Sequence, residues 1–210
     1  MEFVIGSLII TSVLVIGIYL LVVKFRQKRQ FSNQGLGEYD LKDITINHID
    51  EMQDGSEFEM YLYRLFLALG YSDAYKTVDS HDFGADLVFT DRSGVRSIVQ
   101  AKRYSEEYQV GIDAVQQVYT ARNYFQAKKA IVVCTTKYTD SCETLAGVNG
   151  VLLLNRGDLI KIINAFSQDD YEKAKEMIER EPRIIYEIWD NPNAQRKKDK
   201  EAEEVVSLLK

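Results

Sequence analysis

The sequence predicts an α/β sandwich built around a mixed sheet, and two patterns lead to this prediction. Between Ser56 and Leu69, apolar residues recur every three or four positions, which is the period of an amphipathic helix. The stretch from Lys128 to Thr136 is a continuous apolar run, as is typical of a strand that is buried on both faces. Strand-like runs alternate with helical segments along this part of the chain, and such alternation favours helices packed on a central sheet.

The same periods, together with glycine and proline breaks, place the other elements. In chain order we expect a short helix near 46–52, the main helix at 56–69, a strand at 75–79, two strands around a turn at 91–94, a helix at 111–125, the buried strand at 128–136, a small helix at 140–146, a strand at 150–154, and helices at 158–165 and 171–180. Gly84 suits a tight turn that leads into the strand beginning at Asp86.

The hairpin between Asp82 and Arg103 carries the most specific group of polar residues. Side chains alternate along a strand, so Gln100 and Lys102 share one face, while Asp86 begins the neighbouring strand. Carboxylate and amide oxygens are ligands for Mg²⁺, and an ammonium steadies charge on a scissile phosphate or an attacking water. These are the groups that a metal-dependent phosphodiesterase site requires.

The register of this hairpin gives a test of the site. If Thr90 paired with Val95 across a four-residue loop, Asp86 would share the face of Val99 and point away from Gln100. A functional site therefore predicts a bulge or a longer loop that shifts the pairing by one residue.

These residues resemble the PD-(D/E)xK nuclease superfamily in its Mrr-like restriction endonuclease branch, where Gln is common at the second acidic position. The resemblance covers about residues 50–163, including Gly55-Ser-Glu-Phe-Glu59 and Ala130–Thr135. It implies a restriction-endonuclease-like α/β sandwich and cleavage of DNA with Mg²⁺, or Mn²⁺ in its place. It also implies a catalytic set of Glu59, Asp86, Gln100 and Lys102, with the metal held by Asp86, Gln100 and the backbone carbonyl of Ala101.

Glu59 has two interpretations, and both can hold. With Ser56 it forms the S-x-x-E pattern that closes a helix start, whereas the corresponding Glu of the resembling family points into the active site. Glu57 is the less favoured alternative to Glu59 as the active-site glutamate, since it lies on another side of the helix. Several further residues are candidates on weaker grounds: Gln116 facing the site, Asp82 as a supporting group or turn residue, His81 as a surface side chain, and Arg103 and Tyr104 as phosphate contacts.

The amino-terminal segment predicts a single membrane span. Phe3 to Val23 holds 21 residues without a charge, which as a helix is roughly 31 Å long and enough for a hydrocarbon core of about 30 Å. Lys24, Arg26, Lys28 and Arg29 follow directly, so the remaining chain is expected in the cytoplasm. A cleaved signal peptide is disfavoured because the basic cluster follows the apolar run.

The expected organisation has four parts: an anchor in the cell membrane at 1–24, a juxtamembrane linker at 25–45, the nuclease domain at 46–166, and a C-terminal helical extension at 167–210. The net charge of −6 argues against a broadly basic DNA-coating protein, although a local cationic groove remains compatible. Two histidines and two cysteines without a C-x-x-C pair argue against a zinc site and against disulfides.

Three functions follow from these features. The first is a membrane-anchored, Mg²⁺-dependent DNA endonuclease that hydrolyses phosphodiester bonds of foreign or modified DNA. The alternative is a catalytically weak or inactive nuclease fold that binds DNA or a partner at the membrane; the uncharged Gln100 and the acidic pI of about 5.1 favour it. The third is a scaffold whose soluble domain forms a homo-oligomer.

Overall fold

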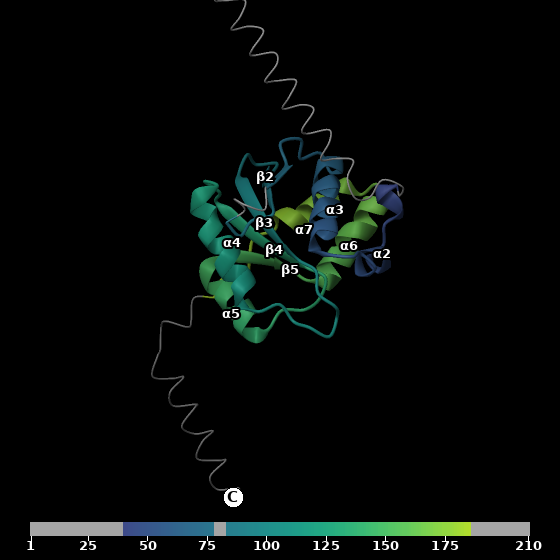
Figure 1. Cartoon of the computed structure of the whole chain (residues 1–210). Coiled ribbons are helices and arrows are strands. Elements are labelled where there is room, and N and C mark those ends of the chain that lie inside the picture. The colour runs from purple at the N-terminus through teal and green to yellow at the C-terminus, as the bar shows by residue number, and fades with distance from the viewer. Residues whose placement is uncertain (1–39, 78–82, 186–210) are drawn as a thin grey trace, which may run out of the picture.

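The computed structural model describes residues 40–77 and 83–185 and contains one five-stranded sheet in the order β1-β2-β3-β4-β5. Strands β1 (Tyr75–Lys76), β2 (Leu87–Thr90) and β3 (Arg96–Lys102) pair antiparallel, whereas β3, β4 (Lys129–Cys134) and β5 (Val151–Leu154) pair parallel. The predicted mixed sheet is therefore confirmed, and Figure 1 shows it at the centre of the described domain.

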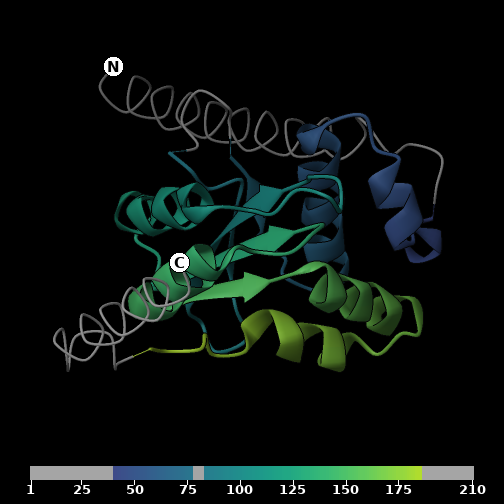
Figure 2. The same ribbon diagram turned by 90° about the horizontal axis from the view of Figure 1, so that it is seen from below.

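Helices cover both faces of the sheet, as Figures 1 and 2 show. One side holds a short 3-10 helix (Leu41–Asp43), α2 (Ile46–Asp50), α3 (Gly55–Ala68), α6 (Arg156–Ser167) and α7 (Tyr171–Glu179). The other side holds α4 (Ile112–Tyr124) and α5 (Asp140–Asn149). The α/β sandwich predicted from the alternation of patterns is thus the observed architecture.

Two hydrophobic cores result from the alternation of side chains along the strands. Leu87 and Val99 belong to the core beneath α3, whereas Val88 and Ile98 belong to the core beneath α4. The apolar run of β4 divides in the same way, and five of its six residues are buried. This burial on both faces explains why the run lacks a polar alternation.

The start of α3 differs from the prediction. The helix is capped by Asp54, whose Oδ1 accepts a hydrogen bond from the N–H of Glu57 at 3.1 Å. The carboxylate of Glu57 in turn accepts the N–H of Gln53 at 2.9 Å. The predicted cap at Ser56 is therefore wrong: Asp is as good a capping residue as Ser, and Asp54 offers the same three-residue spacing two positions earlier.

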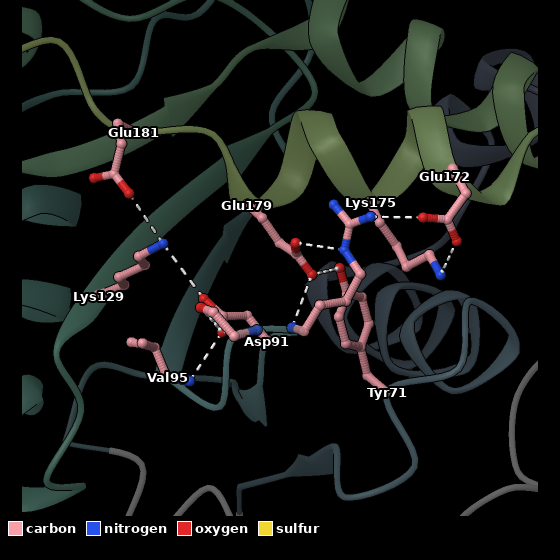
Figure 3. Close-up of polar contacts among 10 residues, drawn as sticks. Tyr71, Asp91, Val95, Lys129, Glu172, Lys175, Glu179 and Glu181 are labelled. Atoms are coloured by element: carbon pink, nitrogen blue, oxygen red, sulfur yellow. Dashed lines mark hydrogen bonds and ion pairs between the residues drawn. The ribbon is translucent and has the colours of Figure 1, made fainter.

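Helix α7 packs into the α3-side core through its buried Ala174 and Ile178. Polar contacts also fasten it to the turn between β2 and β3, as Figure 3 shows. Arg92 from this turn forms ion pairs with Glu172 at 2.6 Å and with Glu179 at 2.7 Å. After α7 the chain crosses to the other side of the domain, where the N–H of Ile185 donates to the carbonyl of Gly147 at 3.0 Å.

The predicted anchor at 1–24 and most of the linker lie outside the described residues, as do His81, Asp82 and the chain beyond Ile185. Within residues 40–77 and 83–185, none of the helices has both the length and the apolar character needed to cross a membrane.

Candidate active site

The turn after β2 sets the register of the candidate site. Thr90 pairs with Arg96, so five residues from Asp91 to Val95 connect the two strands. Within this turn, Oδ1 of Asp91 accepts the N–H groups of Ser93 and Val95, each at 2.9 Å. The loop is thus one residue longer than a plain four-residue hairpin, which confirms the expected shift in pairing. Continued from Leu87 opposite Val99, this register brings Asp86 level with Gln100.

Asp86 and Gln100 lie in direct contact inside the protein. Each is only 6% exposed. Oδ2 of Asp86 accepts a hydrogen bond from Nε2 of Gln100 and another from the N–H of Ala101, both at 2.6 Å. The backbone of Asp86 is fixed as well, because its N–H donates to the carbonyl of Val99 at 2.8 Å and its carbonyl accepts from Thr77 at 2.9 Å. The carboxylate is therefore held in place between two strands.

The amide nitrogen of Gln100 lies between two oxygens. It is 2.6 Å from Oδ2 of Asp86 and 3.4 Å from the carbonyl oxygen of Ala101. Rotation of the Gln100 side-chain amide by 180° would place its oxygen where its nitrogen now lies. The oxygen atoms that could bind a metal would then be those of the Asp86 carboxylate, the Ala101 carbonyl and the Gln100 amide. Oxygen donors of this kind suit Mg²⁺. The set has one carboxylate, and within the part of the chain that the structure describes no three His, Cys, Asp or Glu residues gather into a metal-binding group.

Lys102 shares the α4 side of the sheet with Gln100. Its Nζ donates to Oε1 of Gln117, on α4, at 2.9 Å. The contact residue is therefore Gln117 and not Gln116, the glutamine expected from the sequence. The sequence contains a signal for this, because Gln117 borders the buried stripe of α4, whereas Gln116 lies farther round the helix. The stripe consists of Ala114, Val115, Val118 and Ala121.

Gly84 brings the loop before Asp86 against the same helix. Its φ is +91°, and a Cβ at this position would lie 2.7 Å from Cβ of Gln117. Any other residue would therefore clash with α4 as well as strain the backbone. The turn predicted at Gly84 is confirmed, and close packing against Gln117 adds a second reason for glycine.

Glu59 has another partner in this structure. Its carboxylate forms a 2.7 Å ion pair with Lys76 of β1, whose side chain is 8% exposed. Lys76 pairs with Leu87, which faces the core beneath α3. Lys76 was not singled out in the sequence, because a lysine in a short strand resembles an ordinary surface residue until α3 is placed over it.

Arg103, one of the candidate phosphate contacts, binds backbone carbonyls in this structure. Its guanidinium donates to the backbone carbonyls of Asp54 at 3.1 Å and Asp50 at 3.3 Å, at the junction of α2 and α3. Tyr104 is fixed through its backbone, which exchanges two hydrogen bonds with the hydroxyl of Thr135. These contacts give both residues a structural role in closing the loop after β3.

Comparison with known proteins places the domain in a family. The Mrr catalytic-domain model, described as restriction endonuclease, matches residues 49–163, more than half of the chain. No curated protein sequence matches.

Three solved structures are similar at low identity. The protein of unknown function AF1548 is 18% identical, with a TM-score of 0.38, over 45% of this chain and 54% of its own. The DNA modification-dependent restriction endonuclease AspBHI is 16% identical, with a TM-score of 0.45, over 68% of this chain and 39% of its own. The MspJI restriction endonuclease, in complex with a 27-mer oligonucleotide, is 16% identical, with a TM-score of 0.45, over 73% of this chain and 39% of its own. The chain thus spans about half or less of the length of these proteins. On the family match over residues 49–163, the chain belongs to the restriction endonuclease family of the Mrr catalytic-domain type.

Proposed function

We propose that this protein is a Mg²⁺-dependent DNA endonuclease that hydrolyses phosphodiester bonds, and that Asp86, Gln100 and Lys102 form its catalytic site. The observation that carries the proposal is the contact of the Asp86 carboxylate with the Gln100 amide and the Ala101 N–H, inside the segment that matches the nuclease family. Lys102 lies two residues farther along the same strand face, which adds a cation beside the oxygen donors.

In this mechanism Asp86, the carbonyl of Ala101 and the amide oxygen of Gln100 would hold the metal. When bound, Mg²⁺ lowers the pKa of a coordinated water and polarises the phosphate. Lys102 stabilises the negative charge that grows on the phosphate oxygens, and Gln117 orients its ammonium through the 2.9 Å hydrogen bond. Glu59 is the proposed supporting residue of this set, and its carboxylate is held by the 2.7 Å ion pair with Lys76.

The single carboxylate supports a second candidate function. Because Gln100 is neutral, the site offers one negative charge, and its amide nitrogen already donates to both Asp86 and Ala101. Affinity for Mg²⁺ should be modest under these conditions. A domain that binds DNA or a protein partner without cleaving it is therefore the alternative.

Cleavage of supercoiled plasmid by the full-length chain in detergent, with Mg²⁺ or Mn²⁺, tests both functions. We expect nicking or linearisation by the parent, its loss in Lys102→Met, and retention in Lys128→Met, which removes an exposed lysine outside the site. Gln100→Glu adds the missing carboxylate and should lower the Mg²⁺ concentration needed for cleavage. A parent that binds DNA without cutting it, together with an active Gln100→Glu variant, would establish the binding module instead.

We also propose that residues 1–24 anchor the protein in the cell membrane with the nuclease domain in the cytoplasm. The uncharged run from Phe3 to Val23 and the basic cluster after it support this. The protein should then sediment with membranes and be released by detergent but not by alkaline carbonate. Val13→Arg with Val15→Arg should release it into the soluble fraction, and equal sedimentation of this variant would contradict the anchor.

Two further points of the proposal concern substrate and assembly. Foreign or modified DNA is the proposed target, and comparison of methylated with unmethylated plasmid tests it directly. A homo-oligomer is proposed because one site cuts one strand, so cutting both strands in one encounter takes two sites. Linear product that appears before nicked circles, together with the mass of the detergent-solubilised protein, would support a dimer; nicked circles first would contradict it.

A further inference from the structure

Two aromatic rings lie exposed beside the candidate site. Phe83 is 52% exposed and Tyr124, at the end of α4, is 57% exposed. Their ring centroids are 4.1 Å apart and the planes are inclined by 39°, so the two rings stack on each other as a tilted pair and offer their outer faces to a ligand. Tyr124 also meets the partly buried Phe125 edge to face at 4.9 Å, which fixes it to the core. We call Phe83 and Tyr124 the aromatic pair.

Backbone strain accompanies the exposure of Phe83. Its φ is +46°, a region that bulky residues rarely adopt and that costs about 1 kcal/mol or more. The adjacent Gly84 packs against Gln117, and this contact holds the loop along α4. A strained, exposed phenylalanine three residues before Asp86 contributes little to a core, and such strain tends to occur where a side chain serves binding.

The position of the aromatic pair relative to the site follows from α4. Gln117, which contacts Lys102, and Tyr124 are seven residues apart, so they lie on the same side of the helix at a distance of about 10 Å along its axis. One DNA strand rises about 3.4 Å per nucleotide, so this distance corresponds to about three nucleotides.

We propose that the aromatic pair stacks on an unpaired nucleobase of the DNA, about three nucleotides from the cleaved phosphate. Exposed rings bind nucleobases by stacking on their faces. In a continuous duplex those faces are covered by neighbouring base pairs, so the occupant is a base at a gap, a flap or a frayed end. This inference rests on the proposed action on DNA, and it names the substrate class: duplex DNA that contains a short unpaired stretch.

Binding of gapped and continuous duplexes tests the inference. The full-length chain carrying Asp86→Asn serves as the parent, so that no strand is cut during the measurement. We expect Tyr124→Leu to weaken binding of the gapped duplex about tenfold or more, with less than a twofold change for the continuous duplex of the same sequence. Tyr124→Phe keeps the ring and should bind as the parent does.

Tyr119→Leu is the matched control. Tyr119 is also exposed on α4, at 41%, but it points to another side of the helix and stacks under Arg122 at 4.5 Å. A photocrosslink from 5-iodouracil placed in the gap should map to Phe83 or Tyr124. Equal losses in Tyr119→Leu and Tyr124→Leu, an unchanged gapped-duplex affinity in Tyr124→Leu, or a crosslink elsewhere would each overturn the inference.

The same measurements separate this inference from the nuclease function. If the wild-type chain cuts plasmid but Tyr124→Leu binds the gapped duplex as tightly as its parent does, the proposed role of the aromatic pair is refuted and the nuclease function is retained. If Tyr124→Leu selectively loses affinity for the gapped duplex but the wild type cuts DNA with neither metal, the nuclease function is refuted and the role of the aromatic pair is retained.

Discussion

Two aspartates at the two ends of β2 are equally buried and yet serve different purposes. Asp86 precedes the strand, Asp91 follows it, and each is 6% exposed. Oδ1 of Asp91 accepts hydrogen bonds from Ser93 and Val95 of its own turn, while its Oδ2 forms an ion pair with Lys129 at 3.3 Å (Figure 3). Oδ2 of Asp86 instead accepts from Gln100 and Ala101, on the neighbouring strand.

The difference lies in what surrounds each carboxylate. Burial alone would raise the pKa of Asp91, but the hydrogen bonds from Ser93 and Val95 and the ammonium of Lys129 outweigh it and lower that pKa. The charge of Asp91 thus stabilises the turn and the ion pair with Lys129. The donors that Gln100 and Ala101 present to Oδ2 of Asp86 are neutral, and that of Gln100 belongs to an amide that can offer its oxygen instead. Burial therefore does not distinguish a structural carboxylate from a candidate catalytic one; the chemistry of the partners does.

The largest expected effect is on activity at Asp86. Asp86→Asn keeps the shape of the side chain but removes the charge, so DNA cleavage should fall by a factor on the order of 10³. The melting temperature should change little, because an amide oxygen can still accept from Ala101. Plasmid cleavage and thermal unfolding of the same preparations check this. Full activity in Asp86→Asn would remove Asp86 from the mechanism.

Asp91→Ala should show the opposite profile. It leaves the N–H groups of the turn without acceptors and Lys129 without its buried partner, so we expect a loss of about 3 kcal/mol in the free energy of unfolding. At a temperature where the variant is folded, cleavage should be close to that of the parent. Denaturant titration gives the first quantity and a plasmid assay the second; a stable but inactive variant would break the comparison.

Lys129→Met separates the ion pair from the hydrogen bonds of the turn. Lys129 is 26% exposed and also reaches Glu181 at 3.2 Å, so solvent weakens its contribution, and a loss of about 1–2 kcal/mol is expected. Its neighbour Lys128 is exposed, and Lys128→Met is the control that should change stability by less than about 0.5 kcal/mol. Equal losses in the two variants would mean that the ion pair adds nothing.

Acid should remove the contribution of Asp91 gradually. Since its pKa is lowered in the folded protein, this carboxylate stabilises the fold above its ordinary pKa of about 3.9, and the stabilisation disappears as pH falls below that value. The difference in unfolding free energy between the parent and Asp91→Asn should therefore be constant near neutral pH and shrink below about pH 4. A difference that grows towards acid would reverse the sign of the argument.

Features that depend on residues near one another in sequence were predicted well. The apolar run of β4 correctly predicted its burial, and the alternation along β3 correctly placed Gln100 and Lys102 on one side of the sheet. The requirement for a longer turn also followed from the sequence, because side-chain direction changes with each residue of register. The prediction failed at the start of α3, where the cap is Asp54 and not Ser56, because Asp54 has the same spacing to Glu57 two positions earlier in the chain.

By itself, then, the sequence determined the sandwich and the hairpin, since these depend on periods that local geometry imposes. It grouped Asp86 with Gln100 only on the condition of a longer turn, which the structure supplies. Only the tertiary structure decided that Gln117 meets Lys102, that Glu59 pairs with Lys76, and that Phe83 stacks on Tyr124. Each of these contacts joins a helix to a strand or loop at a distance in the chain. Their geometry depends on how far a helix is rotated and shifted over the sheet, which the packing of both cores fixes together.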